Sequence, residues 1–389
     1  MTESLKIADI YDKNLNFLIG SGASYGLFPT LALNIKNDAG ASQTIETLAT
    51  LFSQDQDRKR HTLLFMHYYS TCIKPVIDFT LDATKDDAIK TKVISNYEAF
   101  VNTVLQILQR RQPLEKRCNI FTTNYDGCFA HVADRVLRGG ALDFVLNDGT
   151  RGFSQRFLQA RNFNSFLCQT GVFERNQYGI PQINLIHVHG SVYWNKDDTS
   201  IRVDYASLNR GDVLPNDIAE KLIDFSSCLM DAGKLISDLP TVELSDAEIN
   251  TFWEKYDELP IVNPTKWKFH ETVFEEHYYQ MLRLLSYELE KPNAVLVTFG
   301  FSFADEHILN LVKRSLSNPS LQVFICCFDA GEQKAMREKF SIHRNVDCVA
   351  VESGVLDFSI FNQKIFTLNP VSASKGTAES ADAVAEVEE

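Results

Sequence analysis

Short apolar runs alternate with amphipathic stretches along most of the chain. Six runs are apolar at nearly every position, at residues 15–19, 118–121, 183–188, 294–299, 321–327 and 347–351. A strand of a parallel sheet is covered on both faces and needs such continuous apolarity. Residues 97–109, 276–290 and 306–316 instead repeat apolar side chains at helical spacing. This alternation predicts an α/β protein with a Rossmann-like doubly wound parallel sheet.

Two long stretches without such runs predict insertions into this sheet. The stretch between the first two apolar runs is longer than one crossover helix needs, and its apolar residues recur at helical spacing. We expect a single domain over residues 1–370, with a helical insertion at about 30–115 and a second, mixed insertion at about 196–292. Residues 371–389 are small, polar and acidic, so we expect a disordered acidic tail.

Composition narrows the classes of function. The net charge of −13 disfavours direct binding to a nucleic-acid backbone, which requires clustered Lys and Arg. No apolar stretch is long enough to span a bilayer, and no signal peptide is visible, so we expect a cytoplasmic protein without a membrane contact. The eight cysteines form no CxxC pair, which predicts neither a zinc ribbon nor a disulfide framework.

The first candidate for chemistry is the turn NFLIGSGASYG at residues 16–26. Gly20 and Gly22 could adopt positive φ and bring backbone N–H groups close to a pyrophosphate, with the positive end of a following helix behind them. The glycine spacing is one residue longer than the dehydrogenase fingerprint, and neither Asp38 nor Glu46 is a convincing ribose-binding acid. A plain tight turn after a buried strand remains the alternative.

Three further strand ends carry polar side chains. In FTTNYDGC, Thr123 and Asn124 offer hydroxyl and amide groups and Asp126 could accept a hydrogen bond from a ribose, although a helix cap is the alternative role. In LIHVHGSVYW, His189 is placed to act as a base near neutral pH, although a buried core histidine is the alternative. No third ligand accompanies the His-x-His pair, so we expect no metal.

The last of these strand ends is LVTFGFSFADEHI, at residues 296–308. Gly300 and Ser302 could hold an adenosine ribose, and Asp305 is an N-cap candidate for the next helix. All four patches follow predicted parallel strands, whose carboxyl ends meet at one edge of a sheet. We therefore expect them to line one crevice.

In this order, the motifs resemble those of the sirtuin-like NAD-consuming family, in particular its bacterial antiphage-defence branch. GSGAS resembles the first phosphate loop, TTNYD the Thr-x-Asn-x-Asp signature, VHG the histidine segment and GFSFADEHI the late Gly-x-Ser loop. The resemblance implies that Asn124 and His189 are catalytic. It further implies NAD as substrate, bound by ten residues: Gly20, Ser21, Gly22, Ala23, Ser24, Thr123, Asp126, Gly300, Ser302 and Asp305.

Departures from the family pattern refine the expected reaction. Deacylating members carry a zinc ribbon and an Asp-Phe-Arg segment, and this chain has neither, with Pro29-Thr30-Leu31-Ala32 after the first loop. Water is then the expected acceptor, which gives ADP-ribose and nicotinamide. A non-catalytic sensor of NAD or ADP-ribose and, less favoured, a protein deacylase stay open as alternatives.

The resemblance also implies how such an activity is controlled. An unregulated NAD hydrolase would poison its own cell, and members of the defence branch are gated by oligomerisation, sensor domains or partner proteins. For this chain we expect a homo-oligomer and a partner that resembles the HerA-type DNA-translocating ATPases, with nucleic acid contacted only through that partner. These expectations rest on the family analogy alone.

Overall fold

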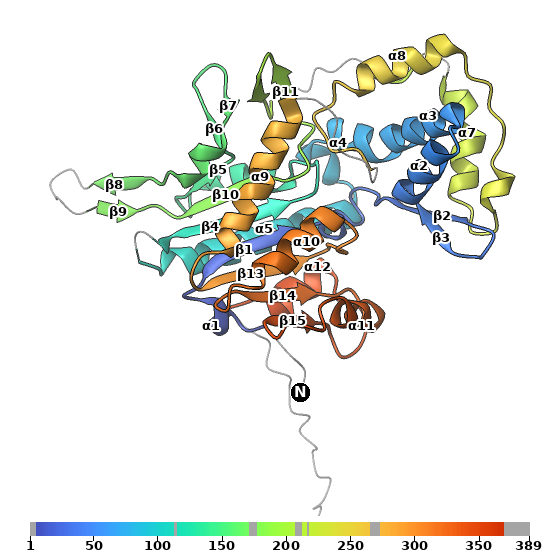
Figure 1. The fold of residues 1–389 in the computed structure, drawn as a ribbon. Helices are drawn as coiled ribbons and strands as arrows, with labels where there is room; N and C mark the ends of the chain where they lie inside the picture. The colour runs from blue at the N-terminus through green and yellow to red at the C-terminus, as the bar shows by residue number, and fades with distance from the viewer. Residues whose placement is uncertain are drawn as a thin grey trace, which may run out of the picture.

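The computed structural model describes residues 5–112, 115–170, 177–206, 212–215, 218–264 and 273–368 (Figure 1). The tail that we expect to be disordered, residues 371–389, lies outside the described residues.

A seven-stranded parallel sheet forms the centre of the molecule (Figure 1). Every neighbouring pair runs parallel. The order across the sheet is β15 (Val346–Val349), β14 (Gln322–Cys326), β13 (Ala294–Phe299), β1 (Asn14–Ile19), β4 (Arg117–Thr122), β10 (Gln182–His187) and β5 (Val145–Asn147). The expected Rossmann-like doubly wound sheet is thereby confirmed.

The six expected strands are present, and the three expected helices lie within α5 (Ala88–Gln109), α9 (Val273–Leu289) and α10 (Glu306–Ser315). Every residue of β10 and β13 is buried, as the continuous runs required. The pattern missed β5, because this edge strand has three residues and all are only half-buried. It also missed the first turns of α5, which begin where the Asp87 side chain accepts hydrogen bonds from two backbone N–H groups.

Aromatic side chains join the sheet to its helices. Phe17 of β1 meets Phe100 of α5 edge to face, with ring centroids 4.9 Å apart, and packs on Phe366 at 5.2 Å. On the same helix layer, α6 (Cys128–Arg138) contacts α5. In the view of Figure 1, α9 and α10 lie in front of the sheet. The remaining described helices at the chain ends are α1 (Ile7–Ile10), α11 (Ala330–Lys339) and α12 (Phe358–Ile360).

A ladder of asparagines, three of them buried and the fourth half-buried, crosses four strands of the sheet. The Nδ2 group of Asn119 donates to Oδ1 of Asn16 at 2.8 Å, and Nδ2 of Asn184 donates to Oδ1 of Asn119 at 2.7 Å. Asn147 continues the ladder by donating to Oδ1 of Asn184 at 3.0 Å. These residues are register partners on β1, β4, β10 and β5. Because a shift of register would leave buried amides without partners, the ladder fixes the alignment of the strands.

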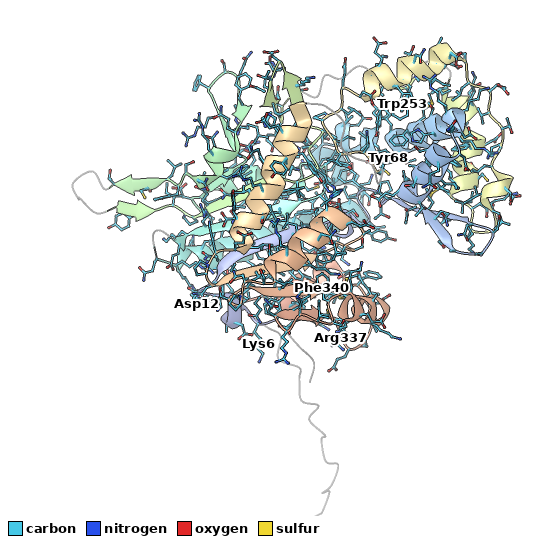
Figure 2. The ribbon with its side chains drawn as sticks, in the orientation of Figure 1. Lys6, Asp12, Tyr68, Trp253, Arg337 and Phe340 are labelled. Atoms are coloured by element: carbon cyan, nitrogen blue, oxygen red, sulfur yellow. The ribbon has the colours of Figure 1, made fainter. Side chains whose placement is uncertain are left out.

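A helical lobe lies beside the sheet and draws on both expected insertions (Figure 1). Within it lies Trp253, which is labelled in Figure 2. Phe65 packs on Trp253 at 5.1 Å between ring centroids, and the Trp253 indole donates to Thr62 Oγ1 at 3.0 Å. The lobe consists of α2 (Ile45–Gln54), α3 (Arg58–Tyr68), α7 (Ile218–Leu229) and α8 (Asp246–Tyr256). It is narrower than the two ranges we expected, because α5 and α9 at their ends contact the sheet.

Three small sheets were not predicted, since their strands are short. They pair β2 (Ala32–Lys36) with β3 (Ser42–Thr44), β8 (Cys168–Thr170) with β9 (Gln177–Gly179), and four strands in the order β11 (Trp194–Asp197), β12 (Ser200–Val203), β7 (Phe157–Leu158) and β6 (Thr150–Arg151). Among the helices that the structure describes, none is long and apolar enough to cross a bilayer.

Candidate active site

The strand order reverses between β1 and β13, because the chain builds outward from β1 in one direction and from β13 in the other. Open α/β sheets bind ligands beside the carboxyl ends of the strands at such a point. Here the loop after β1 packs directly on the loop after β13. The N–H of Gly20 donates to Phe299 O and the N–H of Gly22 donates to Gly300 O, both at 3.0 Å.

The glycines of these two loops are required by this backbone contact. A Cβ at Gly22 would lie 2.7 Å from Gly300 Cα, and a Cβ at Gly300 would lie 2.6 Å from the nitrogen of Ala23. Gly300 also has a φ of +62°, which strains other residues. The three glycines therefore let two loops touch at the switch point.

Two expectations for the first loop were wrong. Gly20 has a φ of −108°, and Gly22 is not in the positive-φ region either. The loop continues into the four-residue 3₁₀ helix η1 (Ser21–Ser24) and not into a long helix with a substantial dipole. The N–H groups of Gly20, Gly22 and Ala23 all donate to protein carbonyls. Neither positive φ nor the end of a long helix is therefore the reason for glycine at positions 20 and 22.

Asn124 stands at the centre of the polar groups beyond β4. Its side chain is buried, and Nδ2 donates to Ser24 Oγ at 3.2 Å. Its backbone N–H donates to Thr122 Oγ1 at 3.0 Å, which holds the turn in place. The other side-chain atom, Oδ1, is buried and has no hydrogen-bond partner. A buried carbonyl oxygen without a partner is costly, so this oxygen is available to accept a hydrogen bond from water or a ligand.

Ser24 and Asp126 hold this amide in position. Ser24 Oγ donates to Asp126 Oδ2 at 2.8 Å, so the Tyr97 hydroxyl, 2.7 Å from Ser24 Oγ, must be a donor to it. Burial, together with the charge of Asp126, raises the pKa of Tyr97 well above its usual value and keeps this proton in place. The other carboxylate oxygen of Asp126 accepts from the N–H of Cys128 at 3.0 Å. Ser24 and Asp126 thus orient Asn124, and Asp126 also caps α6.

His187 fixes the same turn from the neighbouring strand, a role that sequence reasoning missed. Its Nδ1 lies 3.0 Å from the backbone oxygen of Asn124. Burial lowers the pKa of His187, so the ring is neutral and donates its Nδ1 proton to that carbonyl. The register of β10 against β4, which pairs His187 with Thr122, could have indicated this contact.

His189 and Asp305 form the second part of the site. His189 Nε2 lies 3.0 Å from Asp305 Oδ2, and the two side chains are 11% and 7% exposed. The other oxygen of Asp305 accepts from the N–H groups of His307 and Ile308 at 2.9 and 3.1 Å, which caps α10. The expected N-cap is therefore confirmed, and the same carboxylate orients a histidine.

The His189–Asp305 contact lies above the ends of the central strands. His189 follows β10 and Asp305 follows β13, with β4 and β1 between them in the sheet. Their contact therefore spans the ends of the two strands that deliver Ser24 and Asn124. Tyr278 of α9 adds a ring 6.0 Å from that of His189, and its buried hydroxyl has no hydrogen-bond partner.

A segment before α9 covers this arrangement. The N–H of Val262 donates to His189 O at 2.9 Å, and the Tyr125 hydroxyl donates to Val262 O at 2.7 Å. Gly190 has a φ of +79°, and a Cβ there would lie 2.0 Å from Pro260 O. Residues 260–262 are thus tied to both the histidine loop and the asparagine turn.

The other residues that the sequence indicated lie on the same loops. Thr123 is half-buried and donates its N–H to Ile19 O at 3.1 Å, and Ala23 is buried. Ser21 and Ser302 are exposed, one on each of the two loops that meet at the switch point.

No group of three or more His, Cys, Asp or Glu side chains gathers as a metal site within the described ranges. Comparison of the chain with protein-family models and with curated proteins finds no match. The function is therefore argued from the geometry of the site and from the sequence resemblance.

Proposed function

We propose that this chain is an NAD glycohydrolase that cleaves the bond between nicotinamide and ribose and gives ADP-ribose and nicotinamide. The observation that supports it most is the buried Oδ1 of Asn124, an acceptor without a protein partner on a side chain that Ser24 holds in place. It lies at the ligand-binding edge of a doubly wound sheet, where His189 and Asp305 also converge.

The chemistry needs orientation more than a strong nucleophile. Nicotinamide is a good leaving group, so the enzyme must hold the ribose and stabilise an oxocarbenium-like centre. Asn124 Oδ1 can accept a hydrogen bond from a ribose hydroxyl or from the attacking water. Its amide cannot rotate freely, because Ser24 engages Nδ2.

His189 is the base of the proposed site. The Asp305 carboxylate, 3.0 Å from Nε2, would favour the tautomer that carries its proton on Nε2, so that Nδ1 acts toward a ribose hydroxyl. Asp305 is a positioning residue, since it acts through His189 in the way that a buried aspartate orients a histidine base. This differs from the nucleotide contact that the sequence suggested for Asp305.

The cellular role follows from the family resemblance. We place the activity in abortive antiphage defence, in a cytoplasmic homo-oligomer whose NAD consumption is released by a HerA-type ATPase partner. Nucleic acid would then act on the partner and not on this acidic chain.

The test is nicotinamide release from NAD by the purified chain, alone and together with a HerA-type ATPase. Asn124→Ala and His189→Ala should abolish release while leaving the thermal unfolding cooperative. Asn310→Ala, an exposed position on α10, is the matched control and should keep the wild-type rate.

The alternative is a sensor that binds NAD or ADP-ribose without turnover. Asn124 and the side chains that hold it could bind a nucleotide equally well in a sensor. The His189–Asp305 pair, however, favours catalysis over sensing. NAD binding with no nicotinamide release, with and without the partner, would support the sensor.

A further inference from the structure

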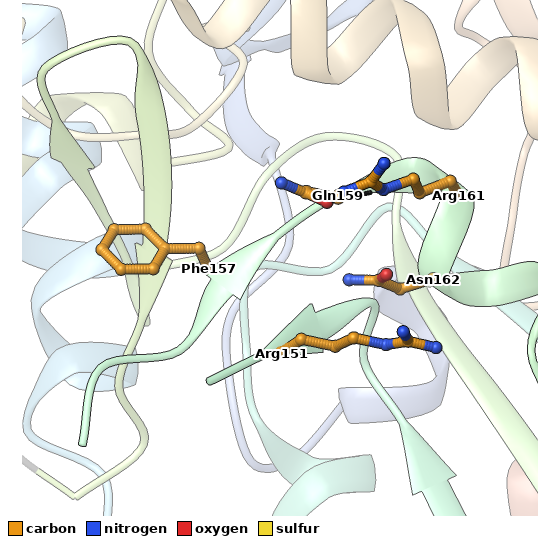
Figure 3. A pocket seen from close by; sticks show the side chains of 5 residues that line it. All are labelled: Arg151, Phe157, Gln159, Arg161 and Asn162. Carbon is orange, nitrogen blue, oxygen red and sulfur yellow. Dashed lines mark hydrogen bonds between the residues drawn. The ribbon is translucent and has the colours of Figure 1, made fainter. Parts of the chain in front are cut away.

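A cavity of about 620 Å³ lies away from the candidate active site and shares no residue with it (Figure 3). Its lining comes from β6, β7 and the 3₁₀ helix η5 (Ala160–Asn164). The residues are Arg151, Phe157, Gln159, Arg161 and Asn162. Ligand pockets of proteins have volumes of about 300–1,000 Å³, so the cavity is large enough for a small molecule.

Two arginines give the cavity an unneutralised positive charge. In the part of the chain that the structure describes, neither Arg151 nor Arg161 has a carboxylate partner, and no acidic residue lines the cavity. The nearby Arg156 differs, because its guanidinium binds both oxygens of Asp148 at 2.9 and 3.0 Å. In a chain of net charge −13, two free guanidinium groups in one cavity indicate attraction for an anion.

The polar wall of the cavity is held in place. Arg161 Nε donates to Gln159 Oε1 at 2.8 Å, which leaves the terminal nitrogens of its guanidinium for a ligand. Asn162 is buried and its Nδ2 donates to Gly149 O at 2.9 Å. Asn147, the last member of the asparagine ladder, donates to Asn162 O at 3.0 Å. The central sheet thereby anchors the wall that carries Arg161.

The cavity has a charged end and an apolar end. In Figure 3 the side chains of Arg151, Arg161, Gln159 and Asn162 lie on one side, and the ring of Phe157 lies on the other side and points away from them. Guanidinium groups bind phosphate through paired, charge-assisted hydrogen bonds. An aromatic ring offers a flat apolar surface to a nucleobase, and a half-buried Phe157 leaves part of its ring accessible.

We propose that this cavity is a binding site for a nucleotide, with Arg151 and Arg161 on the phosphates and Phe157 against the base. The site is independent of the proposed NAD hydrolysis, because it uses other residues, which lie on the small sheet and η5 and not at the ends of the central strands.

The experiment is isothermal titration calorimetry of the full chain with ATP, and in parallel with pyrophosphate and with adenosine. ATP should bind, pyrophosphate should bind more weakly, and adenosine should give no detectable heat. Removal of a charge-assisted hydrogen bond costs about tenfold or more in affinity. The double variant R151Q/R161Q should therefore lose about a hundredfold in ATP affinity.

The control is Arg344→Gln, which removes an exposed guanidinium just before β15, at the edge of the central sheet opposite β5, and should leave ATP affinity unchanged. The single variant Arg161→Gln should weaken ATP binding about tenfold. It replaces the double variant in the test if the double variant misfolds. Wild-type protein that binds neither ATP nor pyrophosphate would overturn the proposal. So would a folded double variant that binds ATP as tightly as wild type, since ATP would then occupy another site.

Discussion

The substitution Asp305→Asn separates the two roles of one carboxylate. Oδ1 of Asp305 caps α10, and Oδ2 faces Nε2 of His189 at 3.0 Å. Asparagine is as good an N-cap as aspartate, so the free energy of unfolding should change by less than about 1 kcal/mol. The new amide would place a donor where the carboxylate accepted. His189 would then have to turn its Nε2 lone pair to that donor and carry its proton on Nδ1, which removes the proposed base.

The expected loss of activity follows from the same distance. At 3.0 Å and an effective dielectric constant of about 20, a carboxylate and an imidazolium attract each other by about 5.5 kcal/mol. Since about 1.4 kcal/mol is a factor of ten in rate, this sets an upper limit of about 10⁴ on the loss in kcat. The two side chains are 11% and 7% exposed, so water screens part of this attraction. We expect kcat to fall by a factor of about 10²–10³. This lies between the usual effect of removing a group that orients a catalytic residue and the effect of a histidine in the wrong tautomer.

The assay is single-turnover release of nicotinamide, followed by chromatography, with thermal unfolding of each variant as the control for folding. His189→Ala supplies the baseline, and H189A/D305N should be no slower than H189A, because Asp305 acts through His189. A folded D305N protein with the wild-type rate would refute the assignment. A double variant much slower than H189A would show that Asp305 contacts substrate itself.

Three further predictions concern the frame of the site. Asn119→Leu leaves Oδ1 of Asn16 without a donor, so the free energy of unfolding measured in urea should fall by about 2–4 kcal/mol. The double variant N16L/N119L should lose less stability than the sum of the two single variants. Additive losses of stability would contradict the ladder. Gly300→Ala places a Cβ 2.6 Å from the nitrogen of Ala23 at a φ of +62°, so Tm and nicotinamide release should both fall, and an unchanged Tm would contradict the backbone contact. Burial lowers the pKa of His67 to about 4, so this neutral ring resists protonation in the folded state. The unfolding free energy should fall by about 3 kcal/mol from pH 6.5 to pH 4, and His67→Gln should flatten that slope in pH-dependent urea melts.

The sheet could be predicted because its strands obey one strong constraint. A strand covered on both faces must be apolar at nearly every position, and six of the seven strands lie in runs of this kind. The asparagine ladder could not be predicted, since a lone Asn inside an apolar run looks like an exception. Only the register of β1, β4 and β10 shows that Asn16, Asn119 and Asn184 are neighbours.

The residues of the candidate site are conspicuous in the sequence, whereas the contacts among them are not. Asn124 and His189 stand at strand ends, where polar side chains are conspicuous in the sequence. The reason for the glycines differs from the expected one, because a contact between two loops far apart in sequence leaves no local signal. The same holds for Asp305, whose partner His189 is brought to it by the strand order alone.

The most direct test of the central claim is the release of nicotinamide from NAD by the chain together with the proposed HerA-type ATPase partner. The account predicts stoichiometric ADP-ribose and nicotinamide from wild type and from N310A, and none from N124A or H189A. Wild-type protein that binds NAD but releases no nicotinamide under any activating condition would contradict it.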